Sequence, residues 1–189
     1  MTVHQRTPVS RADPSRPAVI GPDAVLDAAA KLLVYDSGAS LGEVATAAGI
    51  GRTTLHKQYP TRQELLLAIG RRALDASEAA IAVAAAADDP LGRLVEDLLP
   101  FGAYQTVLGQ HYEVFQDEGI RHRAERVHAP LAALVGASVP VRAGVPDWWL
   151  VRALHAILFT AWDLVQMGWL APRDAGGLVR STFLHGIAA

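Results

Sequence analysis

A short polar segment from Arg52 to Tyr59 carries side chains that suit contact with a polyanion. Arg52 and Lys57 supply positive charge for phosphate, and the threonine, histidine and glutamine side chains supply donors and acceptors for base edges. At helical spacing only Leu55 points inward. The outward face offers Arg52, Thr53, Thr54, His56, Lys57 and Gln58. This pattern predicts a helix that reads a nucleic-acid duplex from the major groove, which is about 12 Å wide and admits one helix.

Two capping boxes and a glycine turn should position this segment. In the first box, Ser40 to Glu43, the serine hydroxyl can accept from the amide of the third helical residue while the glutamate reaches back to the cap amide. The short helix that starts there cannot continue past Gly49. Pro60 ends the next helix, and a second box, Thr61 to Glu64, starts a long one. Two short helices joined by such a turn have the spacing of a helix-turn-helix.

The remaining elements are also predicted to be helical. Apolar residues recur at helical spacing from Pro22 to Ser37, from Thr61 to Ala87, from Trp148 to about Met167 and from Asp174 to about Gly186. We expect breaks near Pro100, Gly109, Gly119 and Gly136, and a loop from Pro140 to Pro146. No convincing alternating strand pattern is present, so the predicted fold class is all-α.

About 45 residues of this region resemble the DNA-binding domain of TetR-family regulators. The similar stretches are Val25 to Ala29, Gly38 to Ser40, Glu43 to Ala45, Ala48 to Tyr59 and Arg62 to Leu65. The resemblance implies that Arg52, Thr53 and Lys57 meet bases or nearby phosphates, with Ser40 at the same interface. It also implies that Thr54, His56, Tyr59 and Arg62 fix the helix against the DNA backbone. The implied partner is operator DNA, and repression is the usual activity of the family.

Three parts of the chain are expected. Residues 1–20, rich in proline, serine and arginine, are predicted to be a disordered arm, either a solvated tail or an arm that follows the duplex. Residues 21–66 are predicted to form the helix-turn-helix domain, and residues 67–189 a domain for ligand binding and dimerisation. Residues 1–72 hold nine lysines and arginines against six acidic residues, and the remainder holds eight against thirteen. That asymmetry fits an N-terminal part that meets phosphate.

In the family the C-terminal body holds a ligand cavity. Candidate lining residues are aromatic or polar side chains within apolar helices, although each can equally be a core residue. They are Phe101, Tyr104, His111, Tyr112, Phe115, Trp149, His155, Phe159, Trp162 and Asp163. Asp163 is the most informative, because a carboxylate in an apolar helix needs an arginine, a histidine or a cationic ligand as its partner. A small, largely apolar or aromatic molecule is the expected effector.

The helix from Trp148 to Met167 carries apolar residues on two faces, which predicts a homodimer. One face can meet its own core while the other meets a partner's last helix. The family resemblance implies that these helices form a four-helix bundle between the two subunits. A fully central helix in a monomer is the alternative. The candidate dimer residues are Leu150, Leu154, Ile157, Ala161, Leu164, Val165, Leu178, Val179, Phe183 and Ile187.

Composition excludes several classes of protein. The 189 residues are 51% hydrophobic and contain no cysteine, which removes disulfides, thiolate zinc sites and cysteine nucleophiles. No apolar run approaches the ~20 uncharged residues of a membrane span and no signal core follows Met1, so a cytoplasmic protein without membrane contact is expected. No cofactor or metal is expected either, because no nucleotide, phosphate or zinc fingerprint is present.

Two other functions remain open at this stage. An enzyme could use His111, Glu118 and His122 as metal ligands if one helical face carried them, although Gly119 is expected to interrupt that helix. No HExxH or GxSxG motif supports catalysis, so no catalytic residue is assigned. An architectural DNA-binding protein without a ligand is the other alternative. It would show little operator preference, whereas a repressor prefers its operator ~10³-fold or more.

Overall fold

The computed structural model describes residues 21–141 and 143–187, so the predicted arm over residues 1–20 lies outside the described residues. The first helices are α1 (Pro22–Tyr35), α2 (Leu41–Ala47), α3 (Arg52–Gln58) and α4 (Arg62–Ala84). Pro22 at the start of α1 suits the first helical position, where its missing amide costs no hydrogen bond. The predicted bounds of these four helices are therefore confirmed to within a few residues.

The rest of the chain is also helical. It forms α5 (Pro90–Leu98), the 3-10 turn η1 (Leu99–Phe101), α6 (Gly102–Gln110), the 3-10 turn η2 (Tyr112–Gln116), α7 (Glu118–Ser138), α8 (Asp147–Gln166) and α9 (Pro172–Ile187). No element among the described residues is a strand, which confirms the all-α class.

The predicted breaks near Gly119 and Gly136 are confirmed to within two residues, since α7 begins at Glu118 and ends at Ser138. Asp117 caps this helix, and its Oδ1 accepts a hydrogen bond of 3.0 Å from the amide of Ile120. Each glycine sits in a terminal turn of α7, where its low helix propensity weighs least against the packing of the helix.

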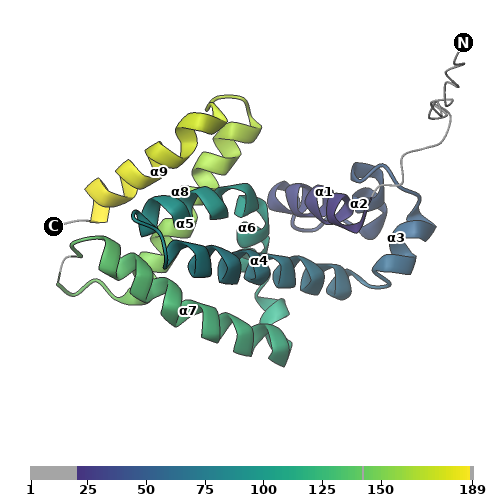
Figure 1. The fold of residues 1–189 in the computed structure, drawn as a ribbon. Coiled ribbons are helices and arrows are strands. Elements are labelled where there is room, and N and C mark those ends of the chain that lie inside the picture. The colour runs from purple at the N-terminus through teal and green to yellow at the C-terminus, as the bar shows by residue number, and fades with distance from the viewer. Residues whose placement is uncertain (1–20, 142, 188–189) are drawn as a thin grey trace, which may run out of the picture.

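The long helix α4 joins the two ends of the molecule (Figure 1). One end carries α1, α2 and α3, which we call the head, and the other lies among α5 to α9, which we call the body. A continuous apolar core runs from Leu33 and Leu55 in the head to Val107, Ile120 and Trp162 in the body. A second core fills the far end of the body between α5, α7, α8 and α9. The head is therefore packed against the body as well as tethered to it.

Within the described residues one helix, α8, is long and apolar enough by length and composition to cross a membrane. A core helix of a soluble protein passes the same test. Leu154 and Leu158 of α8 are buried, and the helix packs against α6, α7 and α9. The protein core thus covers part of the apolar surface of α8, since 33% of its most apolar window is buried.

Candidate nucleic-acid interface and effector cavity

Local hydrogen bonds position α3. Glu43 Oε2 accepts from the Ser40 amide at 2.7 Å while the Ser40 hydroxyl accepts from the Glu43 amide at 3.3 Å, so the predicted first capping box is confirmed. Hydrogen bonds from the Ser40 amide and hydroxyl to its carboxylate lower the pKa of Glu43. Gly49 takes φ +66°, the left-handed conformation that a glycine adopts freely, and turns the chain from α2 toward α3. The second box, between Thr61 and Glu64, opens α4.

The two faces of α3 differ sharply. Leu55 has no exposed surface and anchors the helix in the head core. The other side exposes Arg52, Thr53, Thr54, Lys57 and Gln58 to solvent. His56 is half-buried, and its Nδ1 lies 3.3 Å from the Pro60 carbonyl. The face predicted to read DNA is thus exposed to solvent, apart from the half-buried His56.

Two predicted phosphate contacts also have a role within the head. Both terminal nitrogens of the Arg62 guanidinium donate to main-chain carbonyls, one to Ala39 and one to Ser37. This residue therefore ties the start of α4 to the connection between α1 and α2. Tyr59 is half-buried, and its pKa is raised by desolvation and then by the charge of Asp23. DNA contact by Arg62 and Tyr59 stays a prediction.

Helix α1 is hydrogen-bonded to the body at two points. The Tyr104 hydroxyl of α6 donates to Asp27 Oδ1 at 2.6 Å, and the Tyr35 hydroxyl donates to Asp163 Oδ1 of α8. Burial raises the pKa of Tyr104, and the hydrogen bond to Asp163 raises the pKa of Tyr35 to about 12, so both phenols remain donors at neutral pH. Asp163 thus has a protein partner, and that partner is a tyrosine of the head.

The predicted ligand residues do not line one cavity. Tyr104 and Asp163 are used by the bonds to α1, and Tyr112 and Trp149 are 64% and 54% exposed. The remaining members are scattered between several environments because their helices face different neighbours. The Phe101 ring centroid lies 5.6 Å from Cζ of Arg72, and Phe115 and Trp162 belong to the core shared with the head. His111 is buried with its Nδ1 2.8 Å from Glu113 Oε1, and Phe159 and His155 lie along α8.

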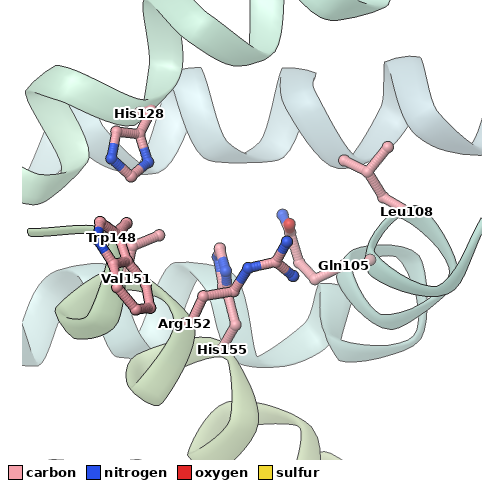
Figure 2. A pocket seen from close by; sticks show the side chains of 8 residues that line it. Gln105, Leu108, His128, Trp148, Val151, Arg152 and His155 are labelled. Atoms are coloured by element: carbon pink, nitrogen blue, oxygen red, sulfur yellow. The ribbon is translucent and has the colours of Figure 1, made fainter. Parts of the chain in front are cut away.

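A cavity of about 290 Å³ lies where α6, α7 and α8 meet (Figure 2). Its lining is Gln105, Leu108, Gly109, His128, Trp148, Val151, Arg152 and His155. Of these only His155 was predicted from the sequence. Arg152 offered the same signal as Asp163, a charge within an apolar helix, and could have been found by it. The other lining residues depend on how three helices cross, which local pattern does not encode.

Half of the predicted dimer residues are covered within the protomer. Leu150, Leu154, Ala161, Val179 and Phe183 are at most 4% exposed, because α8 and α9 pack these faces against α5 and α7. Ile157, Leu164 and Val165 are partly buried, Leu178 is 50% exposed, and the side chain of Ile187 is outside the described part of the chain. An apolar groove of about 210 Å³ between α8 and α9 is lined by Ile157, Leu164 and Leu178 together with Thr160, Ala161, Val179 and Thr182.

The structure does not assemble a metal site from His111, Glu118 and His122. No group of three histidine, aspartate or glutamate side chains in residues 21–141 and 143–187 is arranged to hold an ion. His111 is buried beside Glu113, whereas Glu118 and His122 are exposed on α7. These three residues therefore do not form the metal site that their sequence positions suggested.

Known proteins similar to this chain are transcriptional regulators. No protein-family model matches the chain. The HTH-type transcriptional repressor LfrR of Mycolicibacterium smegmatis is 33% identical over 157 residues, which are 80% of this chain and 78% of the repressor.

Solved structures agree with that relative. The crystal structure of the TetR-like regulator LfrR from Mycobacterium smegmatis with proflavine superposes with a TM-score of 0.68 at 26% identity, covering 88% of this chain and 96% of that one. The TetR-family regulator PfmR of Thermus thermophilus shares the fold, with a TM-score of 0.56 at 21% identity over 87% of this chain and 99% of its own. The protein described here belongs to the TetR family of DNA-binding transcriptional regulators.

Proposed function

We propose that this regulator is a homodimeric repressor that reads a palindromic operator with α3 and leaves it when a small molecule fills the body. The observation that carries the proposal is the solvent-exposed polar face of α3 behind two formed capping boxes. Arg52 and Lys57 are its cations, and Thr53 and Gln58 supply hydrogen-bonding groups for base edges. Its place of work is the cytoplasm, where operator DNA is found, and it needs no catalytic group.

Dimerisation is supported by the apolar surface that α8 and α9 leave open. Ile157, Leu164 and Leu178 line one groove, and Met167 and Trp169 beyond it are 49% and 79% exposed. Exposed apolar surface of this kind is typical of a subunit interface. Two heads related by a two-fold axis would present their α3 helices to half-sites about 34 Å or more apart.

Release by a ligand is supported by the LfrR structure, which contains proflavine. In the present chain, the side-chain amide of Gln105 lines the cavity and donates to the Ala73 carbonyl at 3.0 Å and to Ser77 Oγ at 2.9 Å. Both acceptors lie on α4, the rod that begins beside α3. A ligand that displaces Gln105 therefore acts on α4, and a small tilt of two such rods changes the spacing of the two heads.

Operator titration tests the proposal. Arg52→Ala should weaken operator binding by about 1–3 kcal/mol and relax sequence preference, because a bidentate contact to a base would be lost. Gel-shift titration at two salt concentrations separates this effect from loss of a phosphate contact, which flattens the salt dependence. Arg173→Ala, an exposed arginine at the start of α9, is the matched control and should bind normally. Unchanged operator affinity in a folded Arg52→Ala/Lys57→Ala double variant would refute reading by α3.

A further inference from the structure

The ionisable side chains that line the cavity between α6, α7 and α8 are all basic. Three of its lining side chains, Arg152, His128 and His155, are basic, and none of its eight lining residues is acidic. Leu108, Val151 and the ring of Trp148 supply apolar walls (Figure 2). At about 290 Å³ the space is near the lower end of small-molecule sites, which suits a ligand of one or two rings.

Arg152 is the cation of this cavity that has no counter-charge. No carboxylate among the described residues lies within 4.0 Å of its guanidinium, whereas His128 has Asp147 Oδ2 at 3.8 Å. Asp163, the second acidic residue of α8 after Asp147, accepts a hydrogen bond from the Tyr35 hydroxyl. The guanidinium also borders an adjoining hollow of about 280 Å³ lined by Gln105, Gly109 and Phe159. An anion entering from either side would meet a free cation.

The larger hollow between α4 and α5 differs in this respect. It measures about 390 Å³, but its charges are already paired. Arg93 donates to both carboxylate oxygens of Asp97 at 2.8 and 2.7 Å, Asp75 bonds Arg123, and Arg72 lies over Phe101 and 3.7 Å from Asp23. A charged ligand there would have to break pairs that the protein already satisfies.

His155 adds a neutral polar group to the cavity. Its Nε2 is enclosed and has no hydrogen-bond partner among the described atoms. Desolvation, followed by the charges of Arg152 and His128, lowers its pKa to about 4, so the ring is neutral near pH 7. An enclosed ring nitrogen without a partner is costly, and a ligand oxygen that displaces the atoms covering it would satisfy it.

We infer that this cavity binds an aromatic molecule that carries an anionic oxygen group, such as an aryl carboxylate. Arg152 pairs with the anion, the neutral His155 ring donates its Nε2–H to it, and the aromatic ring packs on Trp148 and Val151. The inference rests on the proposed function and gives its effector a charge. Proflavine, the compound in the LfrR structure, is an aromatic cation, and a cation would face like charge here. The two regulators are thus expected to respond to ligands of opposite charge.

A matched set of probes tests the sign of the charge. Naphthalene-2-carboxylate, 2-(aminomethyl)naphthalene and naphthalene-2-methanol share one ring system and differ in charge. Titration calorimetry with the full chain near neutral pH should give the carboxylate ~10-fold or more tighter binding than the amine, with the alcohol between them. Because Arg152 is exposed on one side, solvent screening keeps this preference modest.

Variants of Arg152 assign the preference to this residue. Arg152→Met should lose the ~10-fold preference for the carboxylate while keeping the affinity for the alcohol, because the apolar walls remain. Arg152→Lys should retain part of the preference, and Arg173→Met should retain all of it. Retained alcohol binding shows that Arg152→Met is folded. Equal or tighter binding of the amine, a preference unchanged in Arg152→Met, or no binding of any probe would overturn the inference.

Operator binding separates this inference from the proposed function. If the unliganded protein retards operator DNA but binds the amine more tightly than the carboxylate, the proposed function is supported and the anionic effector is refuted. If the protein prefers the carboxylate but binds no operator DNA, the anion site is supported and the proposed repressor function is refuted. When both hold, the carboxylate should release the operator complex, and operator DNA should weaken carboxylate binding by the same factor.

Discussion

The head and the body place their functional residues by different means. In the head, hydrogen bonds spanning three residues cap α2 and α4, and one left-handed glycine turns the chain between α2 and α3. In the body, the cavity and the groove are made by residues that lie far apart in sequence, such as Gln105, His128 and Arg152. Local bonds form wherever the sequence allows, whereas a cavity exists only if whole helices cross at the right distance. The head should therefore tolerate changes in the body better than the body tolerates changes at its own crossings.

The largest expected effect comes from charging the open groove of the body. In Leu164→Glu/Leu178→Glu, two carboxylates would be buried at the proposed dimer interface, so we expect a monomer of about the chain mass, 20.1 kDa. Operator affinity should fall ~100-fold or more, because two linked heads gain from effective concentration and a single head does not. Sedimentation and gel-shift titration measure both. Val83→Glu, at a 46% exposed residue on α4, is the control and should remain dimeric. A dimeric double variant would contradict this interface.

Replacing a glycine by alanine should change the free energy of unfolding in opposite directions in the head and in the body. A Cβ at Gly102 would lie 2.6 Å from Cβ and Cγ of Trp162, so Gly102→Ala forces α6 and α8 apart and should cost about 1–3 kcal/mol of unfolding free energy. A Cβ at Gly42 in α2 meets only Ser40 Oγ at 3.6 Å, and Gly42→Ala should stabilise by about 0.5–1 kcal/mol. Urea unfolding measures both, and a neutral Gly102→Ala would show that this helix crossing is not tight.

Acid should weaken the body through His155. The folded protein keeps this ring neutral down to about pH 4, whereas the unfolded chain takes up the proton below its ordinary pKa of 6.5. The contribution is complete above pH 6.5 and is lost as the pH falls toward 4. Between about pH 7 and about pH 5 the unfolding free energy should fall by on the order of 1–2 kcal/mol more in the wild type than in His155→Gln. Identical pH profiles in urea unfolding would contradict the low pKa.

The smallest expected effect concerns the contact between the regions. Tyr35→Phe removes one hydrogen bond to Asp163 on an exposed side chain, so the loss of stability should be at most about 1 kcal/mol. Its sharper readout is the coupling between ligand and operator, since the bond joins α1 to α8. We expect the ligand-induced drop in operator affinity to change while the affinity of the unliganded protein stays the same. Gln166→Ala, an exposed residue further along α8, should leave the coupling intact.

The sequence predicted the head well because its signals are short in range. Ser40, Glu43, Thr61 and Glu64 form the bonds that their spacing indicates, and Leu55 is the one inward residue of α3. The same reasoning was less successful in the body. Breaks near Gly119 and Gly136 were located, since α7 begins one residue before the first and ends two residues after the second, but the contacts between helices were not.

Partners across long sequence distances were beyond local pattern. Asp163 was expected to need a partner, and it has one, but that partner is Tyr35, 128 residues away. Leu154 and Phe183 fit a dimer stripe by periodicity, yet both have no exposed surface within the protomer. Periodicity identifies which face of a helix is apolar. Which neighbour covers that face depends on the arrangement of the other helices.

The two hydrogen bonds from α1 to the body have a mechanical consequence. Asp27 and Tyr35 are eight residues apart, so their attachment points lie about 12 Å apart along one helix axis. A helix attached to the body by one hydrogen bond can rotate about that point, whereas a helix attached at two points keeps its orientation. Together with α4 the pinned α1 forms a braced frame rather than a single hinge. A movement transmitted to the DNA must therefore move α1 and α4 together as a rigid body, or first break the hydrogen bond of Tyr35 or Tyr104.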